Sequence, residues 1–193
     1  MVNNVLANQI LDTAMSLAES SSWEKVHLYT IAQKLEISLD QIRQSYPQKD
    51  DLVEAWFDRA DSAILNINPS PDFINLSARE RLHKIMMTWF EALASHRRIT
   101  GEMLLYKLEF GHIHLQVLGV MRISRTVQWF REAAQIDTTS LRRILEEAGT
   151  TTIYLMSFAR WLNDDSHQFS KTREFLDQTL LNAEQCAKKI GFN

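Results

Sequence analysis

Cysteine, proline and glycine are all scarce in this 193-residue sequence. Cys186 is the only cysteine, so no intrachain disulfide can form. Five glycines and three prolines are too few turn-forming residues for a sheet-rich fold with many hairpins. No run approaches the roughly 18 uncharged apolar residues of a membrane span, and no basic residue precedes the first apolar stretch as in a signal peptide. We therefore expect a cytoplasmic chain that does not insert into a membrane.

A basic excess is also lacking. The chain has 21 Lys and Arg against 24 Asp and Glu, a formal net charge of -3, so no field of the whole molecule draws it to nucleic acid. The acidity is concentrated in residues 1–60, which hold five basic and nine acidic residues. The 45% of hydrophobic residues is enough for a buried core and excludes disorder of the whole chain.

What the sequence does contain is apolar residues spaced three and four apart. Ile10, Leu11, Ala14, Leu17 and Ala18 share one helical face, and the spacing recurs along the chain without a stretch that alternates at period two. This predicts an all-α fold. The expected helices, about nine, lie near residues 5–20, 27–35, 38–45, 49–66, 77–95, 100–110, 114–135, 138–163 and 170–190.

Local signals support these boundaries. Ser38 with Gln41 and Ser77 with Glu80 fit a capping box, in which a hydroxyl accepts a bond from a backbone amide and the longer side chain reaches back. Residues 66–75 hold two of the three prolines, which makes this segment the best candidate for a division between an N-terminal and a C-terminal part.

The two short helices 27–35 and 38–45, after a longer first helix, form the pattern of a helix-turn-helix. Here the sequence resembles the N-terminal domain of the TetR (tetracycline-repressor-like) family of bacterial transcription regulators. The residues that carry the resemblance are 10–14, Trp23, Val26, Leu28, 31–32, Leu35, 37–38, Tyr46, Pro47, Lys49 and Leu52. The resemblance implies a helix-turn-helix domain at 1–48 and a helical effector-binding and dimerisation domain at 49–193.

The resemblance also implies that operator DNA is a partner. The DNA-binding candidates are His27, Tyr29, Leu39, Asp40, Gln41, Arg43, Gln44, Tyr46 and Lys49. Tyr46 and Lys49 follow the second short helix, where a hydroxyl and an ammonium reach phosphate oxygens; alternatively, Tyr46 closes a small core and Lys49 is solvated.

Several of these positions depart from the family pattern. Glu36 stands where the turn usually has Gly, Arg43 replaces the usual aromatic, and Leu39 and Asp40 replace small or basic residues. Because phosphate neutralisation supplies most non-specific affinity, the acidic N-terminal segment is a handicap for DNA binding. Gln41, Arg43 and Gln44 could still read base edges, and Asp40 can accept a hydrogen bond from cytosine.

Residues 82–162 are rich in methionine and aromatic residues, which suit a cavity for a flexible apolar ligand. In TetR-like proteins this region surrounds an effector pocket; the alternative is an ordinary packed core. The ligand-binding candidates are Met86, Trp89, Phe90, Met103, Tyr106, Phe110, Met121, Arg122, Tyr154 and Phe158, with His83 and His114 as further polar residues.

The last two helices, 138–163 and 170–190, each carry a narrow apolar face. In the family the corresponding pair forms a four-helix bundle with its copy in a homodimer; the alternative is that both faces close the monomer core. A repressor of a palindromic site needs two DNA-binding domains, one for each half-site. The resemblance therefore predicts a homodimer, and it also implies release from DNA by a small apolar effector.

A second resemblance covers the C-terminal half. Residues 121–135, 141–166 and 172–184 are similar to the ubiquinone-biosynthesis lipid-binding proteins, which share the TetR fold and do not act as DNA-binding regulators. The shared features include the Arg142–Arg143 pair, Trp161 and the 175–177 run. The alternative function is thus a lipid- or quinone-binding accessory protein whose helix-turn-helix domain does not bind DNA.

Nothing in the sequence indicates catalysis. His112 and His114 lie two apart and would point to different sides of a helix, and no third ligand is spaced to complete a zinc site. No nucleophile elbow or glycine-rich phosphate loop occurs. We expect a protein that is not an enzyme, with no cofactor and no metal, in which Cys186 packs on the apolar side of the last helix.

Overall fold

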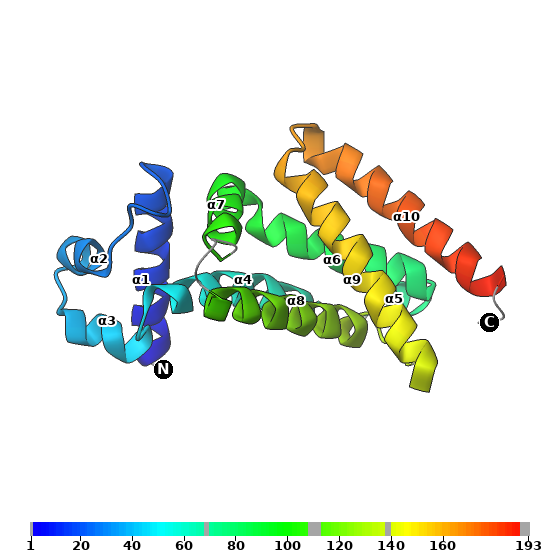
Figure 1. The fold of residues 1–193 in the computed structure, drawn as a ribbon, viewed down its shortest axis with the longest axis horizontal. Helices are drawn as coiled ribbons and strands as arrows, with labels where there is room; N and C mark the ends of the chain where they lie inside the picture. The colour runs from blue at the N-terminus through cyan, green and yellow to red at the C-terminus, as the bar shows by residue number, and fades with distance from the viewer. Residues whose placement is uncertain (1, 68–69, 108–112, 138–139, 190–193) are drawn as a thin grey trace. The chain divides into compact units, whose positions relative to one another are not determined.

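The computed structural model describes residues 2–67, 70–107, 113–137 and 140–189, without the side chains of 2–4, 107, 113–116, 118 and 140–141. In this part of the chain all regular structure is helical, as predicted (Figure 1). Each of the nine predicted helices has a counterpart there, with ends that differ by a few residues. The helices are α1 (Val2–Glu19), α2 (Leu28–Leu35), α3 (Leu39–Ser45), α4 (Lys49–Leu65), α5 (Pro71–Ile74), α6 (Ala78–Leu93), α7 (Arg97–Lys107), α8 (Ile113–Ala133), α9 (Ser140–Leu162) and α10 (Ser170–Lys189).

The chain divides into two compact units. The first comprises residues 1–59 and 93–119, and the second comprises residues 60–92 and 120–193. The divisions fall within α4, α6 and α8, so the first unit includes α7 in addition to the predicted helix-turn-helix domain of residues 1–48.

The first unit is built on α1, which packs against α2, α3 and α7. Ile10, Leu11, Ala14 and Ala18, which the spacing placed on one face of this helix, are all buried. Ile31 of α2 and Ile42 of α3, the two short helices packed on α1, are also fully buried. The apolar stripe of the first helix therefore holds the two short helices in place.

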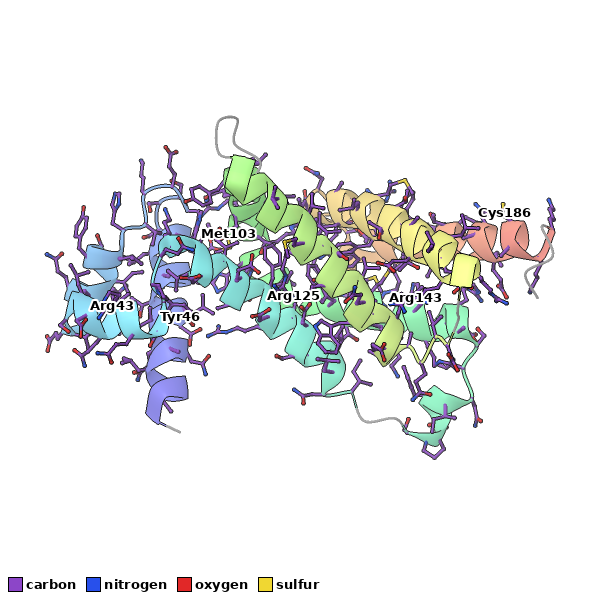
Figure 2. The ribbon with its side chains drawn as sticks, turned by 60° about the horizontal axis from the view of Figure 1, so that its bottom comes forward. Arg43, Tyr46, Met103, Arg125, Arg143 and Cys186 are labelled. Carbon is purple, nitrogen blue, oxygen red and sulfur yellow. The ribbon has the colours of Figure 1, made fainter. Side chains whose placement is uncertain are left out.

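In the second unit, α9 and α10 are joined by residues 163–169, which include the short 3-10 helix His167–Phe169, and pack against each other (Figure 1). Leu176 and Leu180 of α10 are buried, whereas Cys186 is exposed on the same helix (Figure 2). The expectation that Cys186 is packed was wrong, because the apolar face of α10 narrows toward its end and leaves this turn of the helix uncovered within the chain.

The proline-containing segment 66–75 does not separate the two compact units. It belongs to the second unit and forms the short helix α5, which the sequence reading missed. Ser70 accepts a hydrogen bond from the Phe73 amide at 3.3 Å, and Phe73 is buried. Proline at the first helical position and a serine cap are favourable for a helix start, and one buried aromatic residue fixes the turn.

Candidate functional site

The turn between α2 and α3 is set by two local features. Glu36 adopts the left-handed conformation (φ 55°), and its amide donates to the carbonyls of Ala32 and Gln33. Two residues later, Ser38 and Gln41 form the predicted capping box: the Gln41 amide donates to the Ser38 hydroxyl, and the Gln41 side chain accepts from the Ser38 amide. The left-handed residue and the cap together end one helix and start the next.

The outer surface of this helix-turn-helix is formed by predicted DNA-binding residues. His27, Tyr29, Leu39, Asp40, Gln41, Arg43 and Gln44 are all exposed. Tyr29 and Leu39 are more than half exposed, and the rings of His27 and Tyr29 stack with centroids 5.2 Å apart. The structure thus brings seven of the nine predicted residues to the surface of one helix pair.

Asp40 binds two of its neighbours on this surface. Its carboxylate accepts from the Arg43 guanidinium at 2.7 Å and from the Gln44 amide at 2.9 Å. The hydrogen bond from Arg43, then that from Gln44 and the charge of Arg43, lower the pKa of Asp40. In the free protein, the groups best suited to read a base edge are therefore paired with a carboxylate.

Tyr46 and Lys49 lie differently from the other candidates. Tyr46 is buried and its hydroxyl donates to the Ala7 carbonyl at 3.1 Å. The Lys49 ammonium donates to the carbonyls of Trp23 and Glu24 at 2.7 and 3.1 Å, and burial lowers its pKa. Both side chains hold the first unit together in the free chain; phosphate contact by either stays a prediction.

Helix α7 is joined to the same region by charged groups. Glu102 accepts from the Trp23 backbone amide at 2.6 Å and from Arg98, and Arg98 also donates to the carbonyls of Ala18 and Glu19. The Lys49 ammonium lies 5.5 Å from the centre of the Tyr106 ring on α7. The sequence alone does not connect Glu102 to this region, because Trp23 is 79 residues away.

The second unit contains an aromatic cluster of predicted ligand-binding residues. The buried residues of this cluster are Trp89 and Phe90 of α6 and Tyr154 and Phe158 of α9. Met86, three residues before Trp89, is fully buried as well. Trp89 meets Tyr154 and Phe158 edge to face with centroids 5.4 and 5.8 Å apart. The cluster continues to Phe130 and Trp161.

A buried ion pair borders this cluster. Asp61 of α4 accepts from the Arg122 guanidinium at 2.5 Å, from the Trp89 indole at 2.8 Å and from the Thr126 hydroxyl at 3.3 Å. Both charged side chains are 6% exposed. Tyr154 is close enough for both charges to influence it, and burial strongly raises its pKa. The structure therefore joins the predicted Arg122 to Asp61, which sequence reasoning did not single out.

The remaining ligand-binding candidates are scattered. Met103 and Tyr106 belong to the first unit, Met103 being fully buried. Met121 is 57% exposed on α8. The ring of His83 contacts the Arg173 carbonyl at 3.1 Å. Phe110 and the side chain of His114 lie outside the described residues.

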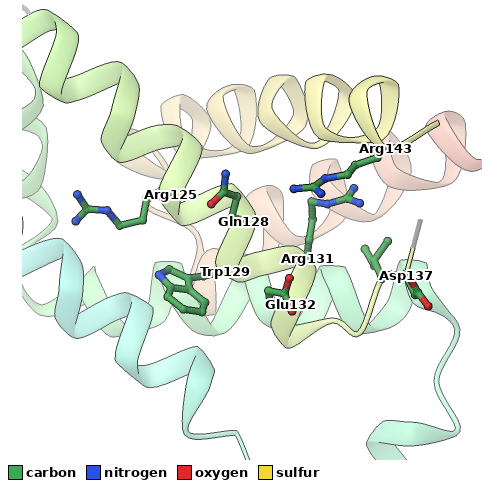
Figure 3. Close-up of a pocket in the computed structure, with 8 residues that line it drawn as sticks. Arg125, Gln128, Trp129, Arg131, Glu132, Asp137 and Arg143 are labelled. Carbon is green, nitrogen blue, oxygen red and sulfur yellow. The ribbon is translucent and has the colours of Figure 1, made fainter. Parts of the chain in front are cut away.

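A hollow of about 510 Å³ lies in the second unit, and none of its lining residues belongs to the aromatic cluster (Figure 3). Its lining comes from α8, the following turn and the start of α9: Arg125, Gln128, Trp129, Arg131, Glu132, Ile136, Asp137 and Arg143. None of these residues was a predicted ligand contact.

Among the described side chains, no three His, Cys, Asp or Glu residues gather as metal ligands would. No described helix is both long and apolar enough to span a membrane.

Comparison with known proteins places this geometry in a family. The chain is 47% identical to a solved TetR transcriptional regulator from Nitrosomonas europaea ATCC 19718, with a TM-score of 0.82 over 93% of this chain and 98% of that one. A TetR transcriptional regulator from Rhodococcus sp. RHA1 shares the fold at 16% identity, with a TM-score of 0.64 over 90% and 94% of the two chains.

A different family appears at the C-terminus. The COQ9 family model matches residues 148–187, within the region that resembles the ubiquinone-biosynthesis lipid-binding proteins. Among curated proteins, the search found no match to this chain.

Proposed function

Because this chain belongs to the TetR family of transcriptional regulators, we propose that it binds operator DNA as a homodimer, acts as a repressor, and is released by a small apolar effector. The observation that carries the proposal is the exposed outer surface of α3 on a capped helix-turn-helix. Arg43, Gln41 and Gln44 of this surface would lie in the major groove, with His27, Tyr29 and Leu39 at its edge.

Asp40 gives this surface an unusual preference. Two outcomes are open to its carboxylate on DNA: it accepts from a cytosine amino group, or it holds Arg43 in place for the acceptors of a guanine. In either case its negative charge opposes binding to phosphates at random sequence. We propose that the acidic N-terminal segment, residues 1–60, lowers the affinity for non-specific DNA more than the affinity for the operator. The ratio of specific to non-specific affinity would then rise.

The DNA-binding proposal is tested with a pool of random duplexes. At low salt the purified protein is expected to select a two-fold symmetric site, and Arg43→Ala is expected to weaken that site about tenfold or more, because a lost base contact costs about 1–3 kcal/mol. Gel-shift titration measures both. Arg125→Ala is the control, since Arg125 is equally an exposed arginine but lies on α8, outside the helix-turn-helix and the proposed dimer helices, and the DNA affinity of this variant should be unchanged.

Selection of no sequence, or equal affinity of the Arg43→Ala variant, would count against the proposal. Lys49→Ala is a poorer test, because Lys49 bonds two carbonyls of the first unit and its removal also loosens the fold there.

For the effector, the aromatic cluster and the Asp61–Arg122 pair are the proposed binding region. Methionine and aromatic side chains repack around ligands more readily than branched aliphatic ones, so Met86, Trp89 and Phe158 can open space for an apolar molecule. The ligand would release DNA only by binding one of two conformations more tightly. Met103 and Tyr106, which belong to the first unit, stay predicted ligand contacts apart from this region.

The proposed dimer uses α9 and α10. The exposed residues of α9 between positions 144 and 159 carry no charge: they are Ile144, Leu145, Ala148, Gly149, Thr152, Leu155, Met156 and Ala159. A glycine inside a helix costs about 1 kcal/mol relative to alanine, yet a Cβ at Gly149 would meet nothing within 4 Å. Because glycine has no side chain, a helix of a second copy could approach closely at Gly149, which would explain a glycine at this position.

We expect Met156→Glu to convert the dimer to a monomer. Met156 is 43% exposed in the single chain, so the substitution leaves the monomer folded, but it would bury an unpaired carboxylate in the dimer at a cost of several kcal/mol. Light scattering coupled to size exclusion measures the mass, and circular dichroism checks the helices. Gln33→Glu, at an exposed position of α2, adds the same charge and should stay dimeric; a dimeric Met156→Glu variant would contradict the interface.

The alternative function is supported by the COQ9 match at residues 148–187 and by the acidic excess in residues 1–60. Under this alternative the chain binds a lipid or quinone and no DNA. Native mass spectrometry of the protein with and without added ubiquinone distinguishes the two functions when it is combined with the duplex selection. A retained quinone together with no selected sequence would favour the alternative.

A further inference from the structure

The hollow between α8 and α9 has the chemistry of an anion-binding site. Three of its eight lining residues are arginines, from two helices: Arg125 and Arg131 from α8 and Arg143 from α9. Glu132 and Asp137 are its acidic residues, so the lining has a net positive charge. Its volume of about 510 Å³ falls in the roughly 300–1,000 Å³ range of small-molecule sites.

Two of the guanidinium groups at the hollow come from different helices. Figure 3 shows the Arg131 and Arg143 side chains reaching toward each other from opposite helices. An anion bound between two guanidinium groups would be attracted by both positive charges. Arg131 forms an ion pair with Glu146 at 3.5 Å, and Glu146 also accepts from Arg142 at 2.7 Å. Arg143, by contrast, is exposed and has no ion pair or hydrogen bond within the described residues.

An apolar wall stands beside the cations. Trp129 lines the hollow and is 39% exposed, and Ile136 lines it too. Arginine pairs bind carboxylates through two parallel hydrogen bonds, and an indole face takes an aromatic ring at low cost. We propose that this hollow binds an aryl carboxylate, with the carboxylate between Arg131 and Arg143 and the ring against Trp129. The site shares no residue with the proposed effector-binding region, and its occupancy does not depend on DNA binding.

Trp129 also provides the measurement. The other four tryptophans, at positions 23, 56, 89 and 161, are at most 3% exposed, so acrylamide quenches mainly Trp129. Titration with 4-phenylbutyrate is expected to protect Trp129 from quenching, and 4-phenylbutanol, which lacks the carboxylate, is expected to bind at least about tenfold more weakly. Trp129→Phe should remove the protected signal.

Arg143→Gln is expected to weaken 4-phenylbutyrate at least about tenfold, measured by quenching and by calorimetry without DNA. Arg43→Gln, at an exposed arginine of the first unit, is the matched control and should bind normally. Arg125→Gln is a second variant at the hollow, and circular dichroism verifies that each variant is folded. No binding of 4-phenylbutyrate, equal binding of the acid and the alcohol, or unchanged affinity of the Arg143→Gln variant would overturn the proposal. Loss of DNA binding alone would leave it intact.

Discussion

Asp61→Ala is expected to destabilise the second unit by about 3–5 kcal/mol, because it leaves the Arg122 guanidinium buried without its carboxylate. It also removes the acceptor of the Trp89 indole and of the Thr126 hydroxyl. Since whole domains are stable by about 5–15 kcal/mol, this loss is a large share of the total. Urea unfolding followed by near-ultraviolet circular dichroism, which reports the aromatic cluster, measures it.

A double variant separates charge from packing. Asp61→Ala combined with Arg122→Met removes both charges, and its stability is expected to recover most of the loss, since buried ion pairs replaced by apolar groups are often neutral. Asp58→Ala, at an exposed acid of the same helix, should change stability by less than about 0.5 kcal/mol. If Asp61→Ala lowered the free energy of unfolding no more than Asp58→Ala, the buried ion pair would not contribute to the stability of the fold.

The pair also bears on the proposed effector. Its members are already bound to each other, so an apolar molecule can occupy the aromatic cluster without leaving either charge unpaired. A ligand with a carbonyl group would have to compete with Asp61 for the Arg122 guanidinium, and the buried Asp61 carboxylate would lose a donor. The proposed region therefore favours effectors without strong acceptors.

The helices could be predicted because each is encoded by its own neighbours. The apolar residues Ile10, Leu11 and Ala14 follow the 3.6-residue period of a helix within five positions. The Ser38–Gln41 and Ser77–Glu80 caps likewise join residues that are three apart. The short helix α5 escaped because four residues carry no period. Its single buried residue, Phe73, becomes informative only once a core surrounds it.

The sites were harder to predict because they depend on contacts across the chain. Asp61 lies 61 residues from Arg122, and Glu102 lies 79 residues from Trp23. No local pattern marks either acid as different from a solvated one. The same holds for the hollow, whose lining includes Arg131 of α8 and Arg143 of α9. Long-range pairs of this kind need either a structure or many related sequences.

Asp164 stands out as the acid that ties α9 to α10. Its carboxylate accepts from the amide and hydroxyl of Ser166 at 2.9 and 2.5 Å, and from the amide and hydroxyl of Thr172 at 2.8 and 2.6 Å. The side chain is 3% exposed. Burial alone would raise the pKa of Asp164, but these four hydrogen bonds outweigh it and hold the pKa well below the usual value.

Asp164→Asn is therefore expected to destabilise the protein by about 2–3 kcal/mol at pH 7, because an amide cannot accept four bonds and a charge-assisted set is lost. The lowered pKa sets the pH dependence. The contribution of the carboxylate is fully present above the unfolded value of about 3.9 and is lost as pH falls toward the folded pKa. The difference between wild type and Asp164→Asn should thus be constant from pH 7 to about pH 5 and shrink below about pH 4.

Urea unfolding at pH 7, 5, 4 and 3 measures this difference, with Asp165→Asn as the control at the exposed neighbouring acid. A difference that stayed constant down to pH 3 would mean that the Asn side chain disturbs packing and that the charge of Asp164 contributes nothing. Because Asp164 fixes the turn between the two helices of the proposed dimer interface, Asp164→Asn should also weaken the dimer, whereas Asp165→Asn should not. Dilution of both variants in a light-scattering experiment decides whether the turn or the α9 surface alone sets the association.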